Sequence, residues 1–146
     1  MNKNEIKKFL NRHYEISQSI DAKLEQIEEL KNLAKKVTTG PFTESHASGG
    51  YTDRVGRTTA RIVDLENEIN EEIDRLVDVR EEMLGLIYTL SDGVLRIILE
   101  RHYLLHEGWE RIADKLGYSP RHITRLHNRA LEELEGAFQS KIAQTA

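Results

Sequence analysis

The chain has 146 residues, of which 32% are charged and 6% aromatic, and its formal net charge is −4. This length can bury one modest core, or a small domain with a long arm, and the composition favours a helix-rich protein with a large surface. The absence of cysteine excludes disulfides and thiolate zinc sites. No signal-peptide run and no membrane-length apolar stretch occur, so we expect a cytoplasmic protein without a membrane partner.

The first part of the chain forms one amphipathic helical pattern. Apolar side chains recur at steps of three or four from Ile6 to Val37. No glycine or proline occurs before Gly40, so the pattern predicts one helix over 3–37, about 50 Å long at ~1.5 Å per residue.

Residues 38–57 interrupt this pattern. They are rich in glycine, serine and threonine, and they include the pair Gly49-Gly50. We therefore predict a flexible loop over 38–57, in which a protease should cut first near Arg54 or Arg57. These arginines could also touch nucleic acid, although a solvated loop explains them more simply.

A second amphipathic pattern covers 58–89. Its apolar residues from Ile62 to Leu86 fit the a and d positions of a heptad, and its surface is strongly acidic. The first helix is rich in lysine, so the two helices are predicted to pair as a long antiparallel coiled-coil arm over 1–89, within one chain or between two. Because a two-helix hairpin alone buries little surface, we also expect a homo-oligomer formed through the arm.

Residues 90–135 are predicted to form a small trihelical helix-turn-helix domain, which makes the whole fold all-α, and 136–146 are predicted to be a C-terminal tail. Ser91 or Asp92 would cap the first helix of this domain, which should end at Leu104. The expected core of the domain consists of Val94, Leu95, Ile98, Leu99, Leu105, Trp109, Ile112, Leu116, Ile123, Leu126 and Leu131.

The segment 109–134 has the pattern of a helix, a tight turn and a second helix. Gly117 stands where a left-handed residue would end the first of these helices. Ser119 follows at an N-cap position, and Pro120 occupies the first helical position, where a missing N–H has no cost. Local sequence therefore predicts a helix-turn-helix.

The outer face of the second helix predicts contact with DNA. No acidic residue occurs between Asp114 and Glu132, although the protein is acidic overall. Helix-turn-helix domains place the start of this helix in the major groove, where arginine contacts guanine. The predicted DNA-binding residues are Ser119, Arg121, His122, Thr124, Arg125, Asn128 and Arg129. We expect Arg121 and Arg125 to read bases and Arg129 to contact the backbone; the alternative is an ordinary solvated helix face.

The histidines offer a weaker interpretation as a metal site. His102 and His106 are four residues apart with Glu107 adjacent, but no third convergent ligand is evident. His122 and His127 are expected to face phosphate or water. No phosphate-binding glycine loop, nucleophile motif or catalytic carboxylate pair occurs, so we predict no cofactor and no enzymatic activity.

The stretch 96–134 resembles region four of bacterial sigma factors. The matching residues before the turn are Arg96, Ile98, Leu99, Arg101, His102, Tyr103, Ile112, Ala113, Leu116 and Gly117. Those after the turn are Ser119, Ile123, Arg125, Ala130, Leu131 and Leu134. By this resemblance the promoter-reading face comprises Pro120, Arg121, Thr124 and Arg125. Pro120 departs from the family, which often has a polar residue there.

The resemblance implies a transcription regulator that binds double-stranded DNA at promoters together with RNA polymerase. No counterpart of the promoter-melting region two is present, so the chain is similar to small sigma-like regulators of phages and prophages in Gram-positive bacteria. Two alternatives stay open at this point. One is a DNA-packaging recognition subunit of the small-terminase kind, which would assemble into rings, and the other is a coiled-coil adaptor or anti-sigma protein.

Overall fold

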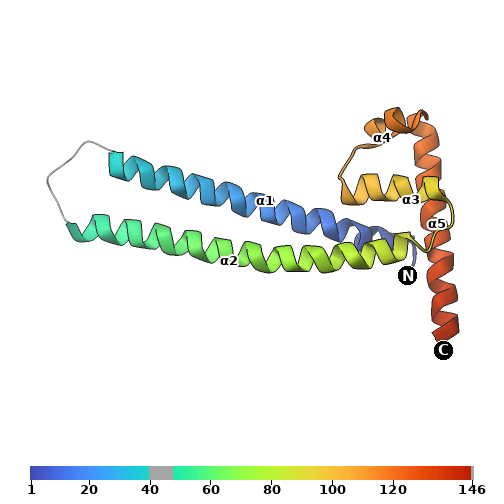
Figure 1. The fold of residues 1–146 in the computed structure, drawn as a ribbon, viewed down its shortest axis with the longest axis horizontal. Coiled ribbons are helices and arrows are strands. Elements are labelled where there is room, and N and C mark those ends of the chain that lie inside the picture. Colours follow the sequence, from blue (N-terminus) through green and yellow to red (C-terminus); the bar gives the residue numbers. More distant parts are fainter. Residues whose placement is uncertain (40–47, 146) are drawn as a thin grey trace. The chain divides into compact units, whose positions relative to one another are not determined.

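The structure, a computed structural model, describes residues 1–39 and 48–145, with the side chains of 1–36 and 53–140. Across these ranges every regular element is a helix, so the predicted all-α class is confirmed. The elements are α1 (Lys3–Thr39), α2 (Ser48–Ile87), α3 (Gly93–Leu99), the π-helix η1 (Glu100–Leu104), α4 (Trp109–Leu116) and α5 (Pro120–Thr145) (Figure 1). They form two compact units: unit 1 comprises Met1–Ile16 with Leu76–Ala146, and unit 2 comprises Ser17–Arg75.

In unit 2, the two long helices lie side by side and antiparallel within one chain (Figure 1). Ile20, Ile27, Leu65 and Ile69 are buried between them. This interior follows from the heptad spacing, because residues three and four apart share one helix face.

One layer of this interior is polar. Lys23 Nζ lies 2.8 Å from Glu72 Oε1, and Ser19 Oγ donates to the same oxygen at 2.7 Å. Glu72 Oε2 is buried and has no hydrogen-bond partner among the described residues. A half-satisfied polar layer stabilises one alignment of the two helices and disfavours the others, since a shift would bury the charges without partners.

The predicted loop over 38–57 is wrong at its two ends. α1 continues to Thr39, and α2 begins at Ser48 instead of residue 58. Near this start, Val55 and Thr58 line a shallow depression together with Leu33 of α1. The rest of the predicted loop, 40–47, lies outside the described residues.

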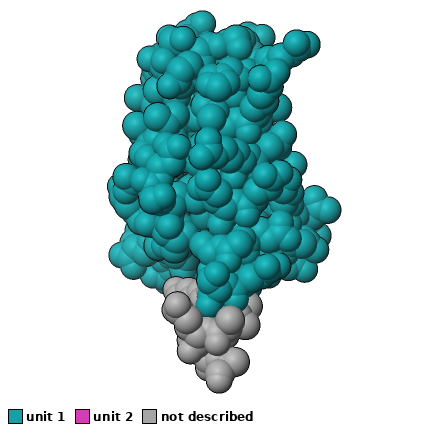
Figure 2. Space-filling view, turned by 90° about the vertical axis from the view of Figure 1, so that its right-hand side faces the viewer, with its two compact units in different colours: residues 1–16, 76–146 teal, residues 17–75 magenta. Residues whose placement is uncertain are grey.

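Unit 1 contains the predicted trihelical segment and more. α5 packs against both α3 and α4. Ile6 and Leu10 of α1 and Met83 and Ile87 of α2 are also completely buried in this unit. Its compact boundary is therefore wider than the predicted 90–135, because that segment alone leaves apolar surface that these residues cover. Figure 2 shows one face of unit 1, drawn in teal.

Three further features differ from the prediction. The expected single helix over 94–104 is α3 followed by η1, whose wider turn ends before Leu105. Leu105 was expected in the core but is 63% exposed, because the chain turns sharply at His106, whose φ is 58°. α5 continues to Thr145, so residues 136–145 belong to this helix and not to a separate tail, and Ala146 lies outside the described residues.

Within the described ranges, none of the helices has the length and apolar character needed to cross a membrane.

Candidate nucleic-acid interface

The turn between α4 and α5 has the geometry that the sequence predicts. Gly117 adopts a left-handed φ of 71°, and the N–H of Tyr118 donates to Ala113 O at 2.9 Å. The N–H of His122 donates to Ser119 Oγ at 3.1 Å, so Ser119 caps α5. Ser119 therefore has the capping role that the sequence predicted for it, and its contact with DNA stays a prediction.

The packing of unit 1 holds the start of α5 in place. Ile98, Ile112, Ala113 and Ile123 form a buried cluster that joins α3, α4 and α5. Around it pack Val94, Trp109, Leu116 and Leu126. Apart from Leu105, the core residues predicted from helical spacing are thus brought together, and the opposite side of α5 is left to solvent.

The predicted reading residues share this exposed side. The side chains of Arg121, His122, Thr124, Arg125, Asn128 and Arg129 are all exposed. Thr124 Oγ1 donates to Pro120 O at 3.1 Å, which orients its hydroxyl along the helix. Arg121 and Arg125 form no ion pair with any side chain that the structure describes. Their charges are available to an external anion.

Arg129 differs from the other two arginines. Its Nε lies 3.3 Å from Glu133 Oε1, one helical turn along α5. An exposed pair of this kind is weak and opens readily. A phosphate would nevertheless compete with Glu133, so Arg129 is a weaker candidate for backbone contact than the sequence suggested.

Tyr118 lies beside this face and was missed by the sequence analysis. Its ring meets the His122 ring edge-on, with centroids 4.9 Å apart, and it is 38% exposed. An exposed aromatic residue directly before an N-cap is the signal that could have identified it.

His127 was expected to face phosphate or water, and this expectation is wrong. It is only 6% exposed, and its Nε2 lies 2.7 Å from Tyr103 Oη. Burial lowers the pKa of His127 to about 4 and raises the pKa of Tyr103 to about 12, so both groups are neutral near pH 7. The spacing was the signal that could have predicted this burial, because His127 stands four residues after Ile123 and four before Leu131, on the same helix face.

A second imidazole ring supports the same region. His102 stacks on Trp109, with ring centroids 3.7 Å apart, and its Nδ1 lies 2.9 Å from Glu107 O. Burial is the main reason why the pKa of His102 is lowered. Trp109 is half-buried and packs against the core, so it serves as the core side chain that its position predicted.

His106 pairs with α1. The distance from His106 Nε2 to His13 Nδ1 is 3.0 Å, and Tyr14 meets the His106 ring edge-on. Among the residues that the structure describes, no group of three or more potential ligands converges on a metal position.

Glu107 is the charged centre of this region that sequence reasoning did not single out. Its Oε1 lies 2.6 Å from Lys115 Nζ and 3.9 Å from Arg111 Nε, and its Oε2 lies 3.2 Å from Arg101 Nη1. The hydrogen bond from Lys115 is the main reason why the pKa of Glu107 lies below its ordinary value. The spacing of Glu107, Arg111 and Lys115 by four residues was the available signal. The carboxylate of Glu107 therefore reduces the positive charge on α4, whereas the positive charge on the exposed face of α5 is not reduced in this way.

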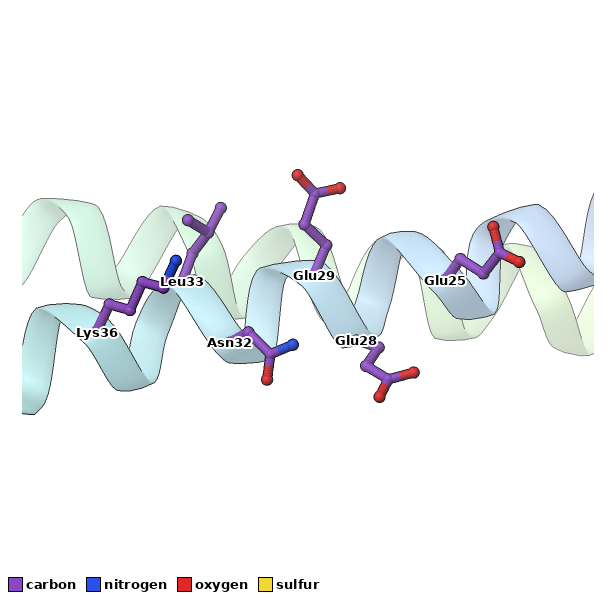
Figure 3. Close-up of a pocket in the computed structure, with 6 residues that line it drawn as sticks. All are labelled: Glu25, Glu28, Glu29, Asn32, Leu33 and Lys36. Carbon is purple, nitrogen blue, oxygen red and sulfur yellow. The ribbon is translucent and has the colours of Figure 1, made fainter.

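A shallow depression on α1 does not form a binding site. It is lined by Glu25, Glu28, Glu29, Asn32, Leu33 and Lys36, which belong to one helix. Figure 3 shows that Glu28 and Glu29 point to opposite sides and do not converge on a common point.

Comparison of the chain with protein-family models, with curated proteins and with solved structures gave no match.

Proposed function

We propose that this protein is a sequence-specific regulator of transcription that binds double-stranded DNA through the exposed face of α5. The observation that carries the proposal is the pair Arg121 and Arg125. Both are exposed and without an ion-pair partner among the described side chains, and they stand one turn apart at the capped end of a helix held by a packed core. Arginine at this end of such a helix is suited to bidentate contact with guanine.

In this proposal, α5 and α4 contact different parts of the DNA. α5 presents arginine, threonine and asparagine, which can contact base edges. α4 presents Arg111 and Lys115, which are suited to phosphate contacts but are restrained by Glu107. The sigma-like resemblance supports promoters as the targets and RNA polymerase as a second partner in the cytoplasm.

The deciding experiment selects bound fragments from a random duplex pool and then compares variants on the selected site. Arg121→Ala and Arg125→Ala should each weaken binding to that site by about tenfold to a hundredfold and relax the preference at one position, since one bidentate contact contributes ~1–3 kcal/mol. Lys8→Ala is the matched control, because Lys8 is an exposed cation on α1. Binding of both arginine variants at parental strength would exclude α5 as the reading helix.

Self-association is part of the proposal. Unit 2 exposes the apolar side chains of Leu24, Leu33, Val63 and Ile73, which are 43% to 50% exposed. Sedimentation of the full chain measures the assembly directly. A dimer or another small oligomer is expected of this regulator, whereas a closed ring of many copies would favour the DNA-packaging alternative.

A further inference from the structure

Positive charge is concentrated at one end of unit 2. The helical segments 30–39 and 48–63 contain six basic residues and a single acidic one, Asp53. The adjoining segment 64–75 has the opposite composition, with six acidic residues and only Arg75 as a basic one. In a chain of net charge −4, this segregation is a local departure that the pairing of α1 with α2 does not require.

Cations from both helices surround one exposed leucine. Leu33 lines a depression of about 240 Å³ together with Arg54 and Arg57 of α2. It also lies beside Lys36 on α1, as Figure 3 shows. Arg61 follows Arg57 by one helical turn. These four cations, Lys36, Arg54, Arg57 and Arg61, are named here the distal basic surface.

The charges of the distal basic surface are little neutralised. Lys36 and Arg54 form no ion pair with any side chain in the described ranges. Arg57 Nε donates to the backbone oxygen of Asp53 at 3.4 Å, and Arg57 has no ion pair with a described side chain. Arg61 lies 3.8 Å from Glu68, and both side chains are more than 40% exposed, so this pair is weak.

The helix dipole does not account for these arginines. Cations near the C-terminal end of α1 are favoured by the negative end of its dipole, which explains Lys36. Arg54 and Arg57 lie in the second and third turns of α2, beyond the first turn in which the dipole acts. An external anion therefore remains as the simplest reason for arginine at these positions.

The spacing of the arginines fits a repeating anion. Arg54, Arg57 and Arg61 lie on neighbouring turns and span ~10 Å at ~1.5 Å per residue. One strand of duplex DNA presents a phosphate about every 3.4 Å of helix axis, so several phosphates fall within reach of this row. Among the described side chains beside these arginines, none has an anchoring hydrogen bond like that of Thr124 on α5, so the surface has the means to bind phosphate but not to read bases.

We propose that the distal basic surface of unit 2 binds the phosphate backbone of double-stranded DNA without regard to sequence. This inference rests on the proposed function in that DNA is the partner, but it concerns a different unit and a different mode of contact. The protein thus carries one reading surface, on α5, and one surface that adds sequence-independent affinity.

The test measures binding of the full chain to a scrambled duplex over a salt series. Arg54→Gln with Arg57→Gln should lower the salt slope by about two and weaken binding severalfold at low salt, because each lost phosphate contact contributes ~0.9 to the slope. Both arginines are exposed, and glutamine keeps the helix, so the fold should be retained. Lys8→Gln with Arg75→Gln removes the same charge elsewhere and should change the slope little.

The outcomes separate this proposal from the proposed function. A slope equal to that of the control variant overturns the distal surface, whether or not Arg121 and Arg125 read bases. A reduced slope with unchanged sequence preference supports it, even if the α5 variants bind as the parent does. Binding of the parent to phosphatidylserine vesicles, lost in the Arg54 and Arg57 variant while its duplex binding stays parental, would assign the surface to a membrane and overturn the proposal.

Discussion

The two units differ in the charge state of their interior polar groups. In unit 1 the buried pair of Tyr103 and His127 is neutral, because burial lowers the pKa of His127 and raises that of Tyr103. In unit 2 the pair of Lys23 and Glu72 is ionic, since their hydrogen bond raises the pKa of Lys23 and lowers that of Glu72. The difference follows from surroundings: a packed core excludes water, whereas a two-helix seam leaves its polar layer near solvent.

This comparison predicts that acid destabilises unit 1 first. The folded pKa of His127 is about 4 and its ordinary value is 6.5, so the unfolded chain takes up the proton first as the pH falls. The stabilisation is complete above pH 6.5 and is lost between 6.5 and 4, by about 3 kcal/mol. The lowered pKa values of His13 and His102 act in the same direction.

The chain has one tryptophan, Trp109, whose fluorescence reports the unfolding of unit 1, while far-ultraviolet circular dichroism reports the helices of both units. Denaturant titrations are run at pH 7 and at pH 4.5. Between these two pH values, the unfolding midpoint seen by fluorescence should fall more than the midpoint seen by circular dichroism of the long helices. Equal midpoints at both pH values would contradict the assignment of His127 as a buried neutral group.

A second prediction removes only the partner of His127. Tyr103→Phe keeps the ring and deletes the hydroxyl, so Nε2 of His127 loses its 2.7 Å partner in a buried setting. The expected loss is ~1–3 kcal/mol of unfolding free energy, measured by the same fluorescence titration. Tyr88→Phe is the control, because the Tyr88 side chain is 59% exposed and should tolerate the change.

A third prediction concerns the polar layer of unit 2. Glu72→Leu leaves Lys23 in the seam without its main partner and should lower the melting temperature seen by circular dichroism. Lys23→Met combined with Glu72→Leu replaces both charges by apolar groups and should restore most of the loss. If the double variant melts no higher than the single one, the loss in Glu72→Leu does not come from an unpaired Lys23 in the seam.

The ionic layer also fixes a pH range for unit 2. Glu72 contributes above its ordinary pKa of 4.5 and loses its effect as the pH falls through its lowered value. The contribution of Lys23 is present below its ordinary pKa of 10.5 and is lost as the pH rises through its raised value. Unit 2 should therefore melt at a nearly constant temperature between these limits, in contrast with unit 1.

The smallest expected effect is on DNA binding through Glu107. Glu107→Gln should release part of the charge of Arg111 and Lys115 and tighten binding to scrambled duplex by about twofold to threefold, with a steeper salt slope. Glu110→Gln is the control, since Glu110 is exposed on the same helix. Equal effects of the two substitutions would mean that net charge alone, and not the three-cation contact of Glu107, governs this binding.

Local signals in the sequence accounted for the helical class and for the turn before α5. Gly117 and Ser119 specify that turn by their own conformational and capping chemistry, so no distant residue is needed. The exposed face with Arg121 and Arg125 followed from helical spacing for the same reason. The role of this face in reading DNA remains a prediction.

Tertiary contacts decided what local spacing could not. α2 begins at Ser48 within a glycine-rich stretch, and α1 contributes Ile6 and Leu10 to a core far away in sequence. His127 is neutral because burial in unit 1 lowers its pKa, at a place where it meets Tyr103 across 24 positions of the chain. Burial and charge state depend on neighbours brought together by folding. Helix periodicity and caps depend on residues within a few positions, which is why the sequence determined those by itself.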